Sequence, residues 1–543
     1  MGKLFLEGKK PYYWIVGLGI LVYFRSLFFG FTYFDDNVLI LDNLWFLKDI
    51  GNIFSTFTME VFHVLHASAA YYRPILTISY MFDAVISGDS PFLYHFTSVV
   101  IHLVNSCLVY LLLKKLKLSQ ALSFAFAAIF VVHPVLLQGV SWIPGRNDTL
   151  LALFLIPSFI FFLDYFEEKK TKYLIWHFVF FALGLFTKES SLFFPAIILF
   201  YAYIIFGKSE IIKKIGSFLT GWIPIYVTWF LLRSVALGSN PTPYTLSSAI
   251  KAVFVNSPAV LLFLGKVFLP FNLTVLPTLQ DSTLIYGIIS LVLVCIAVVT
   301  SKHKKLSIML FGLVWFLAFL LPSFIRPNTS YVADFLEHRV YFPLIGLFII
   351  LSEVSFIKNI NFEKKITSGI FGVLLSGLII INFVHNTNFK DKLIFWKNAV
   401  AHSPQHPLAH KNLGAMYYLN NDLANAEVEF KKSVELNPTE PMIHNNLGLI
   451  YFRNGDFIKA QEEFAKELEL YPTYDNAFFN WGLVYYTMGE KDKAAEMWLK
   501  CVAVNPDHKE ALRNLAYYYL TDKKDEVKGN YYYQEAVKRG VQF

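Results

Sequence analysis

Two adjacent carboxylates, Asp35 and Asp36, follow the first long apolar segment of the sequence, in the stretch Phe34-Asp35-Asp36-Asn37. Two acids side by side at a membrane surface repel each other, so one of them can have a raised pKa and serve as a general base. The alternative is structural: Asp36 or Asn37 caps an amphipathic helix that starts at Val38. Taken alone, the acidic pair leaves both interpretations open.

Further ionisable residues are predicted on the same side of the membrane as the acidic pair. Considered one at a time, each of these residues can be explained as a member of an ion pair or as a long side chain that reaches the membrane interface. Ionisable groups at membrane depth are nevertheless costly, and a collection of them indicates a site. The collection comprises His63, His66, Tyr72-Arg73, His133, Arg146-Asn147-Asp148, Lys188-Glu189 and Glu337-His338-Arg339. The sequence contains no compact His and carboxylate ligand set, so we predict no metal site, although the acidic pair could hold a divalent ion.

These residues need a membrane domain to position them. Of the 543 residues, 55% are hydrophobic and only 16% are charged, whereas soluble domains carry about 25% charged residues. A fully soluble enzyme is therefore excluded. Eleven apolar segments are long enough to cross a bilayer as helices, which takes about 20 residues each. They lie near residues 12–30, 95–113, 119–137, 149–166, 173–187, 190–206, 215–235, 283–301, 306–325, 339–357 and 366–385.

Lysine clusters fall in alternate connections between these segments, as the positive-inside rule requires. The clusters begin at Lys9, Lys114, Lys169, Lys208, Lys302 and Lys358. A further stretch, 252–270, is interrupted by Pro258 and Lys266 and would break this alternation, so we predict that it is interfacial or re-entrant. The N-terminus is then cytoplasmic, and the first outer loop, residues 31–94, faces the other side together with everything after the last span.

The charge balance and the cysteines exclude other classes of function. Cytoplasmic lysines explain the net charge of +7 more simply than nucleic-acid binding does. Three dispersed cysteines are too few for a disulfide framework or a metal cage. We therefore expect no nucleic-acid partner and no cysteine chemistry.

After residue 385 the composition becomes charged and rich in tyrosine, and the sequence repeats with a period of 34. The repeated positions are small at Gly414, Gly448 and Gly482 and at Ala426, Ala460 and Ala494, and proline at Pro438, Pro472 and Pro506. This is the tetratricopeptide pattern of paired helices. We predict an all-α chain with two domains, a polytopic membrane domain over 1–385 and a tetratricopeptide-repeat solenoid over 386–543, with a capping unit near its end.

The sequence resembles the transmembrane and tetratricopeptide-repeat O-mannosyltransferases (TMTC), which belong to the glycosyltransferase C superfold. The stretches that carry the resemblance occur in the order of that family and are followed by repeats. They are FTYFDDNVLI, YYRPILTISYMFD with LYHFTSVVIHLVN, HPVLLQGVSWIPGRNDTLLALF, FTKESSLFFPAIILFY and EHRVYFPLIGL. The acidic pair alone is not specific for this family, whereas the ordered set of stretches is.

The resemblance implies inverting transfer of a sugar, typically mannose, from a polyprenyl phosphate donor to a Ser or Thr hydroxyl of a protein. By alignment with the acidic pair of that family, Asp35 accepts the hydroxyl proton and Asp36 orients or assists it. Fixed cations stabilise the phosphate that leaves. The candidate cations are, in order, Arg339, Lys188, Arg146 and His338. No cofactor besides the lipid-linked donor is implied.

Asparagines recur at one position of four successive repeats, on the first helix of each unit: Asn412, Asn446, Asn480 and Asn514. A carboxamide both donates and accepts, so it can hold a peptide backbone without reading its side chains. The asparagine ladder of the nucleocytoplasmic O-linked N-acetylglucosamine transferases is similar. The alternative is that these side chains satisfy backbone groups between repeats.

Two other functions compete with transfer to protein. In the first, the enzyme transfers the sugar to a lipid or a glycan, and the repeats recruit a partner. In the second, the chain is a non-catalytic scaffold that is anchored in the membrane. Charges near the outer surface argue against the scaffold, which does not need them. The composition favours a bacterial inner membrane with a periplasmic site, whereas Asn147, Asn272 and Asn328 lie in glycosylation patterns that fit an endoplasmic reticulum.

Overall fold

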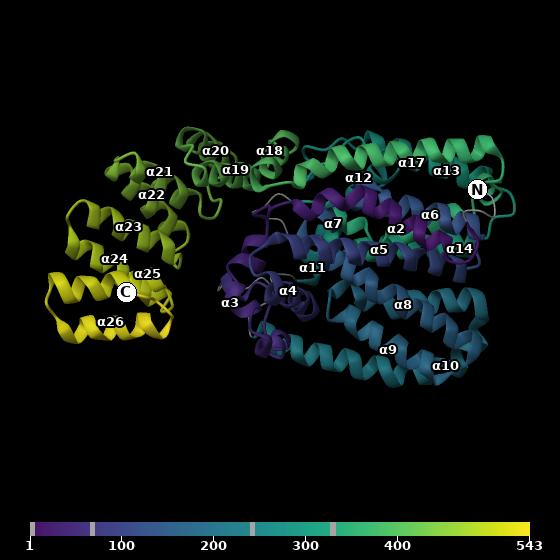
Figure 1. Ribbon diagram of the computed structural model, residues 1–543, viewed down its shortest axis with the longest axis horizontal. Helices are drawn as coiled ribbons and strands as arrows, with labels where there is room; N and C mark the ends of the chain where they lie inside the picture. Colours follow the sequence, from purple (N-terminus) through teal and green to yellow (C-terminus); the bar gives the residue numbers. More distant parts are fainter. Residues whose placement is uncertain (1–5, 66–70, 239–244, 326–332) are drawn as a thin grey trace. The chain divides into compact units, whose positions relative to one another are not determined.

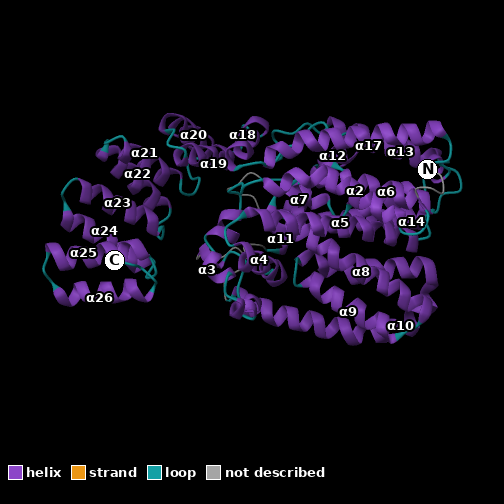
Figure 2. Ribbon diagram, viewed as in Figure 1, coloured by secondary structure: helices purple, strands orange, loops and turns teal. Residues whose placement is uncertain are grey.

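The computed structural model describes residues 6–65, 71–238, 245–325 and 333–543 (Figure 1). These residues form helices and loops, with no strand among them; one isolated antiparallel bridge pairs Thr278 with Asp334 (Figure 2). The predicted all-α class is confirmed. The chain divides into two compact units, Met1–His402 and Ser403–Phe543.

The first unit is a bundle of long apolar helices with short helices at one end. Its helices are α2 (Lys10–Tyr23), α3 (Leu44–Leu47), α4 (Pro74–Ser87), α5 (Pro91–Lys115), α6 (Gln120–Val132), α7 (Gln138–Ser141), α8 (Arg146–Glu168), α9 (Thr171–Leu185), α10 (Phe194–Leu237), α11 (Leu246–Asn256), α12 (Ala259–Phe268), α13 (Ile285–Thr300), α14 (Leu306–Leu320), α15 (Leu344–Ser352), α16 (Ser355–Lys358), α17 (Lys365–Asn386) and α18 (Lys392–His402).

Within the described residues, six helices have the length and apolar composition to cross a membrane, and each of two bent helix pairs adds one more if it counts as a span. The expected number of eleven is not confirmed. Several expected segments are shorter as helices: α9 has 15 residues, α13 has 16 and α15 has 9. Two others, 190–206 and 215–235, belong to α10, which is kinked at Gly207.

The two bent pairs mark places where the apolar sequence continues but the helix does not. α6 ends at Val132, and the helical segment Pro134–Ser141 continues at an angle of 52°. α11 and α12 meet at 44° around Ser257 and Pro258, inside the stretch 252–270 that was expected to be interfacial or re-entrant. The bend suits either a broken span or a re-entrant loop. Proline removes a helix hydrogen bond at both places.

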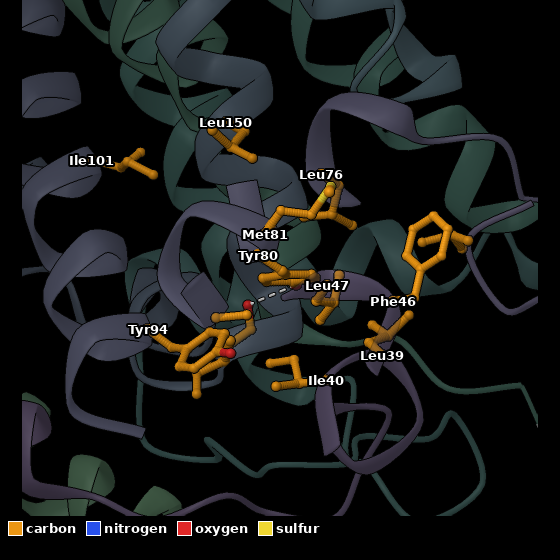
Figure 3. Packing of buried hydrophobic residues seen from close by; sticks show 13 residues of the cluster. Leu39, Ile40, Phe46, Leu47, Leu76, Tyr80, Met81, Tyr94, Ile101 and Leu150 are labelled. Atoms are coloured by element: carbon orange, nitrogen blue, oxygen red, sulfur yellow. Dashed lines mark hydrogen bonds between the residues drawn. The ribbon is translucent and has the colours of Figure 1, made fainter. Parts of the chain in front are cut away.

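The end of the bundle that carries α3 and α4 has its own apolar core (Figure 3). Leu39 and Ile40, three and four residues after Asp36, pack there with Leu47 and Tyr80, and all four are nearly inaccessible to solvent. This packing fixes the loop that contains the acidic pair. Burial of side chains of this size stabilises the fold by about 1.5–3 kcal/mol each.

The second unit consists of helix pairs. Its helices are α19 (Pro407–Leu419), α20 (Leu423–Leu436), α21 (Ile443–Arg453), α22 (Phe457–Leu470), α23 (Asp475–Thr487), α24 (Lys491–Val504), α25 (Lys509–Tyr517) and α26 (Glu526–Lys538). A Cβ atom on Gly414 would lie 2.6 Å from the ring of Phe430, and one on Gly448 would lie 2.7 Å from that of Phe464. The repeated glycines thus let paired helices approach, as the period of 34 predicted.

Candidate active site

The acidic pair lies in the loop between α2 and a short helix, Asn37–Leu41. The backbone N–H and the hydroxyl of Thr32 both donate to Asp36 Oδ2, over 2.7 and 2.9 Å. The Asp36 side chain makes no cap hydrogen bond to the helix that follows it. The interpretation of Asp36 as a helix cap is therefore wrong, and its carboxyl group is held against the preceding loop instead.

The two carboxyl groups have different environments. Only 1% of Asp36 is exposed, and burial raises the pKa of its carboxyl to about 7 against the opposing effect of the Thr32 hydrogen bonds, with a smaller upward contribution from Asp35. Asp35 is half-buried and has a backbone φ of 65°, in the left-handed region that few non-glycine residues adopt. Asp35 is therefore the member of the pair that a substrate can reach, and its backbone is of a kind that clusters at functional sites.

Aromatic contacts join the acidic loop to the segment between α7 and α8. The indole N–H of Trp142 donates to the Phe34 carbonyl over 2.9 Å, and the two rings stack with centroids 5.1 Å apart. On its other side Trp142 lies 5.2 Å from the ring of His338. Residues separated by some 300 positions in the sequence thus meet around one indole.

Asp148 links two of the predicted cations. It lies in the first turn of α8, where a carboxylate is favoured by the helix dipole. Lys188 Nζ donates to both of its oxygens, over 2.8 and 2.7 Å, and His338 Nε2 lies 3.5 Å from Oδ2. Lys188 and His338 are therefore held together by one acid that the sequence analysis named but assigned no role.

Further cations surround Lys188. Burial lowers the pKa of its ammonium group, Asp148 opposes this shift, and the nearby guanidinium groups of Arg73 and Arg339 add to it. Arg73 itself pairs with Glu189 over 3.5 Å. Three cations, each paired with a different acid, thus converge in one region, where they can stabilise an added anion.

Arg339 and His338 share a short turn, Glu337–Val340, that Glu337 anchors. The Glu337 carboxylate is fully buried and accepts from Lys266 Nζ over 2.6 Å, from the Thr274 N–H over 2.9 Å and from His385 over 3.0 Å. Arg339 donates to the Asp334 carbonyl and carboxylate. The turn that presents two predicted cations is thus fixed by α12, α17 and the loop after α12.

Arg146, the remaining predicted cation, has a different environment. Its guanidinium is completely buried, pairs with Asp83 over 2.6 Å, and donates to the Ser98 hydroxyl and the Tyr94 carbonyl. The ring of Tyr80 lies 4.9 Å below it. These contacts join α4, α5 and α8, so the geometry favours a structural role for Arg146 over contact with a phosphate.

We expect Arg146→Met to destabilise the protein by about 3–5 kcal/mol, because it leaves the buried Asp83 carboxylate without its cation. Thermal unfolding of the detergent-solubilised chain measures the effect. Arg146→Met combined with Asp83→Leu is the matched control and should recover much of the loss. If the single variant is as stable as the wild type but fails to use the lipid donor, Arg146 contacts the donor phosphate and the structural role is wrong.

Sequence reasoning missed several residues that hold the site together: Trp142, Lys266, Asp83 and His385. Lys266 was noticeable in the sequence because it interrupts an apolar stretch. No nearby residue, however, indicated that Glu337 is its partner. Among the described residues no group of three or more His, Cys, Asp or Glu side chains is arranged to hold a metal ion. The expectation of a metal-free site stays a prediction.

The recurring asparagines of the repeats are all half-buried. Asn480 Nδ2 donates to Asn445 Oδ1 of the preceding repeat over 2.9 Å, and Asn445 in turn donates to Asn446 Oδ1 over 3.4 Å. Two of the four side chains therefore contact one intermediate asparagine, Asn445. Contact with a peptide and contact between repeats are both compatible with this arrangement.

Comparison with known proteins finds similar families for segments of both parts of the chain. Residues 76–232 match the family "Dolichyl-phosphate-mannose-protein mannosyltransferase". Residues 414–455, 441–474 and 479–540 match families of tetratricopeptide repeats. The matched segment of the membrane unit includes most of α4 and all of α5, α8 and α9, and with them Trp142, Asp148 and Lys188.

Curated relatives of the chain are named protein O-mannosyl-transferases. The chain is 30% identical to human protein O-mannosyl-transferase TMTC3 over 148 residues, which is 27% of this chain and 16% of the relative. It is 34% identical to mouse protein O-mannosyl-transferase TMTC1 over 90 residues, 16% of this chain and 10% of the relative. A longer match, 23% identical over 378 residues, covers 66% of this chain and 53% of protein O-mannosyl-transferase F38B6.6 of Caenorhabditis elegans. The predicted resemblance is confirmed, although the matches to TMTC3 and TMTC1 span less than a fifth of either relative.

Proposed function

We propose that this chain is a membrane glycosyltransferase that moves mannose from a polyprenyl phosphate to Ser or Thr hydroxyls of a protein. The observation that carries the proposal is the meeting of the acidic loop, through Phe34 and Trp142, with the cluster of Asp148, Lys188 and His338. The names of the relatives support mannose and protein. An acid beside converging cations is the arrangement that transfer from a phosphate ester needs.

In the proposed reaction the acceptor oxygen attacks C1 of the sugar from the face opposite the phosphate. The C1–oxygen bond to phosphate breaks, and its electron pair leaves with the polyprenyl phosphate. The hydroxyl proton passes to the Asp35 carboxylate, because an alcohol is a poor nucleophile at neutral pH. Lys188 and Arg339, with His338 beside them, stabilise the charge that the leaving phosphate gains. The lipid tail stays in the bilayer, which accounts for a hydrophilic reaction in a membrane protein.

Donor release tests the proposal directly. The purified full chain is incubated with polyprenyl phosphates that carry mannose, glucose or N-acetylglucosamine, with and without an unfolded Ser- and Thr-rich protein. We expect polyprenyl phosphate to be released from the mannosyl donor, and only when protein is present. Release that depends on added lipid or glycan instead would favour the alternative acceptor, and no release from any donor would favour the scaffold.

The orientation of the active site belongs to the same proposal. The alternating lysine clusters support an acidic loop on the non-cytoplasmic side of the membrane, and an odd number of spans would bring the repeats to the same side. A bacterial periplasm and the lumen of an endoplasmic reticulum would both satisfy this orientation.

For the repeats we propose binding of an extended acceptor. Changing Asn446 and Asn480 together to Ala should raise the KM for protein acceptor by about thirtyfold, at about 1 kcal/mol for each lost amide contact. The KM for the lipid donor should stay nearly constant, because the lipid contacts the membrane helices. The matched control is Asn445→Ala, which removes the side chain that both asparagines contact within the solenoid. A lower melting temperature with unchanged acceptor kinetics would assign the asparagines to packing between repeats.

A further inference from the structure

A polar cavity lies at the end of the membrane unit opposite to the candidate active site. α5 and α8 both begin near the site, and their far ends, Lys115 and Glu168, lie at the other end of the bundle (Figure 1). The cavity has a volume of about 410 Å³ and is bounded there by parts of α5, α6, α8, α10, α14 and α15. Neither the proposed transfer reaction nor the family matches assign it a role.

One wall of this cavity is cationic. Four lysines and two glutamates line it: Lys115, Lys117, Lys305, Lys358, Glu167 and Glu353. The charge of Lys115 is balanced within the protein, because Lys115 forms ion pairs with Asp164 and Glu167. Lys117, Lys305 and Lys358 lie at the surface, and the side chain of Lys117 is 78% exposed. The surface of the wall therefore has an excess of positive charge.

The glutamates do not cancel this excess. Glu353 is largely buried and accepts from both the Lys358 ammonium, over 2.8 Å, and the Lys305 backbone N–H, over 3.1 Å. Glu167 lies between Lys115 and Lys117, at 3.4 and 3.3 Å. Each acid is thus shared between two donors. The first turn of α6, which begins at Gln120 beside the cavity, adds the positive end of a helix dipole.

The other walls are apolar and face the membrane region. They include Leu122 and Leu163, together with Ile205 and Phe206 just before the kink of α10 at Gly207. Ile205 is 47% exposed, although it lies on a long apolar helix. A ligand with an anionic group and a hydrocarbon chain would fill both halves of the cavity. The anionic group would lie at the lysines, and the chain would lie along these apolar residues.

We propose that this cavity binds one anionic phospholipid, with its phosphate at Lys117, Lys305 and Lys358 and an acyl chain along Ile205 and Phe206. The lysine-rich end of a membrane protein faces the leaflet that carries anionic lipids, and basic pockets between membrane helices bind their head groups. A zwitterionic lipid fits the apolar walls equally but gains nothing from the lysines. The cavity therefore selects for net negative charge.

Native mass spectrometry of the full chain in neutral detergent tests the proposal, with phosphatidylglycerol and phosphatidylcholine of identical acyl chains as probes. We expect one phosphatidylglycerol per chain, retained about fivefold or more over phosphatidylcholine. The triple variant Lys117→Gln, Lys305→Gln, Lys358→Gln should reduce retention of phosphatidylglycerol by about tenfold. Lys172→Gln, Lys213→Gln, Lys302→Gln is the matched control: these exposed lysines lie outside the cavity, so the same loss of charge should leave retention unchanged.

A second variant tests the apolar half. Ile205→Trp fills the space beside Phe206 without changing charge, and it should lower retention of phosphatidylglycerol while the protein remains folded, because the site is partly exposed. Equal retention by wild type and by the lysine variant would overturn the proposal, as would equal retention of the two lipids. Full competition by glycerol 3-phosphate at the concentration of the lipid would also overturn it, because the cavity would then bind phosphate without a lipid chain.

Discussion

Asp35→Asn should lower turnover by about a hundredfold or more, while binding of the lipid donor survives. Asparagine keeps the size and hydrogen-bonding capacity of the aspartate but cannot accept the acceptor's proton. Asp35 is the more accessible carboxylate of the pair, and its backbone is held in the left-handed region by the loop that follows α2. The measurement is steady-state release of polyprenyl phosphate, with the donor dissociation constant determined separately.

Asp36→Asn is the matched control, because Asp36 is its immediate neighbour and its pKa is raised to about 7. The raised pKa means that Asp36 is protonated below pH 7, where the neutral asparagine resembles it, and that it ionises as the pH rises through 7. If the neutral form supports Asp35, wild-type turnover should fall above pH 7, whereas Asp36→Asn should lack that fall. The variant should therefore differ little from wild type at pH 6.

Two outcomes would remove Asp35 from the reaction. Near-normal transfer by Asp35→Asn is the first. The second is a large loss in Asp36→Asn at pH 6 with little loss in Asp35→Asn, which would move the base to the buried carboxylate. In that case the Thr32 hydrogen bonds, and not exposure, would decide which acid reacts.

The repeat unit could be predicted in detail because its information is local. A period of 34 places a glycine opposite an aromatic ring in the first three helix pairs of the unit, and Gly414 with Phe430 shows the contact that the period requires. The membrane unit was predicted less well. Hydropathy reports how far an apolar stretch extends but not whether its backbone stays helical, so the bend after Val132 was missed. The kink at Gly207, in contrast, lies where two separate segments, 190–206 and 215–235, were predicted to divide.

The candidate site shows a related limit. Charged residues were identified as a set, but a sequence shows a charge and not its partner. Arg146 and Lys188 were both candidates for the phosphate site, yet Arg146 is enclosed with Asp83 and Lys188 is bound to Asp148 beside other cations. The two contacts join residues 63 and 40 positions apart, and no local pattern encodes them. Their roles in catalysis remain predictions.

Arg339→Ala should lower kcat/KM for the lipid donor by about a hundredfold, and Arg339→Lys by about tenfold. The structure gives a reason beyond the loss of a cation. Arg339 Nη2 lies 2.5 Å from Asp334 Oδ1, and Nη1 donates to the Asp334 carbonyl over 2.6 Å. In the Ala variant the Asp334 carboxylate loses the Arg339 guanidinium, so its negative charge opposes the phosphate as the phosphate gains charge. Lysine keeps a compensating charge but loses the forked geometry.

Asp334→Asn separates the two contributions. If the uncompensated carboxylate causes part of the loss, the double variant Arg339→Ala, Asp334→Asn should recover about tenfold of the activity lost by Arg339→Ala, and this non-additivity is the measured quantity. If Arg339 acts only by fixing the turn that carries His338, the Lys and Ala variants should lose activity and melting temperature together, and removing the Asp334 charge should recover neither. A parallel loss of that kind would leave Lys188 as the cation that meets the phosphate, because Asp148 holds it independently of Asp334.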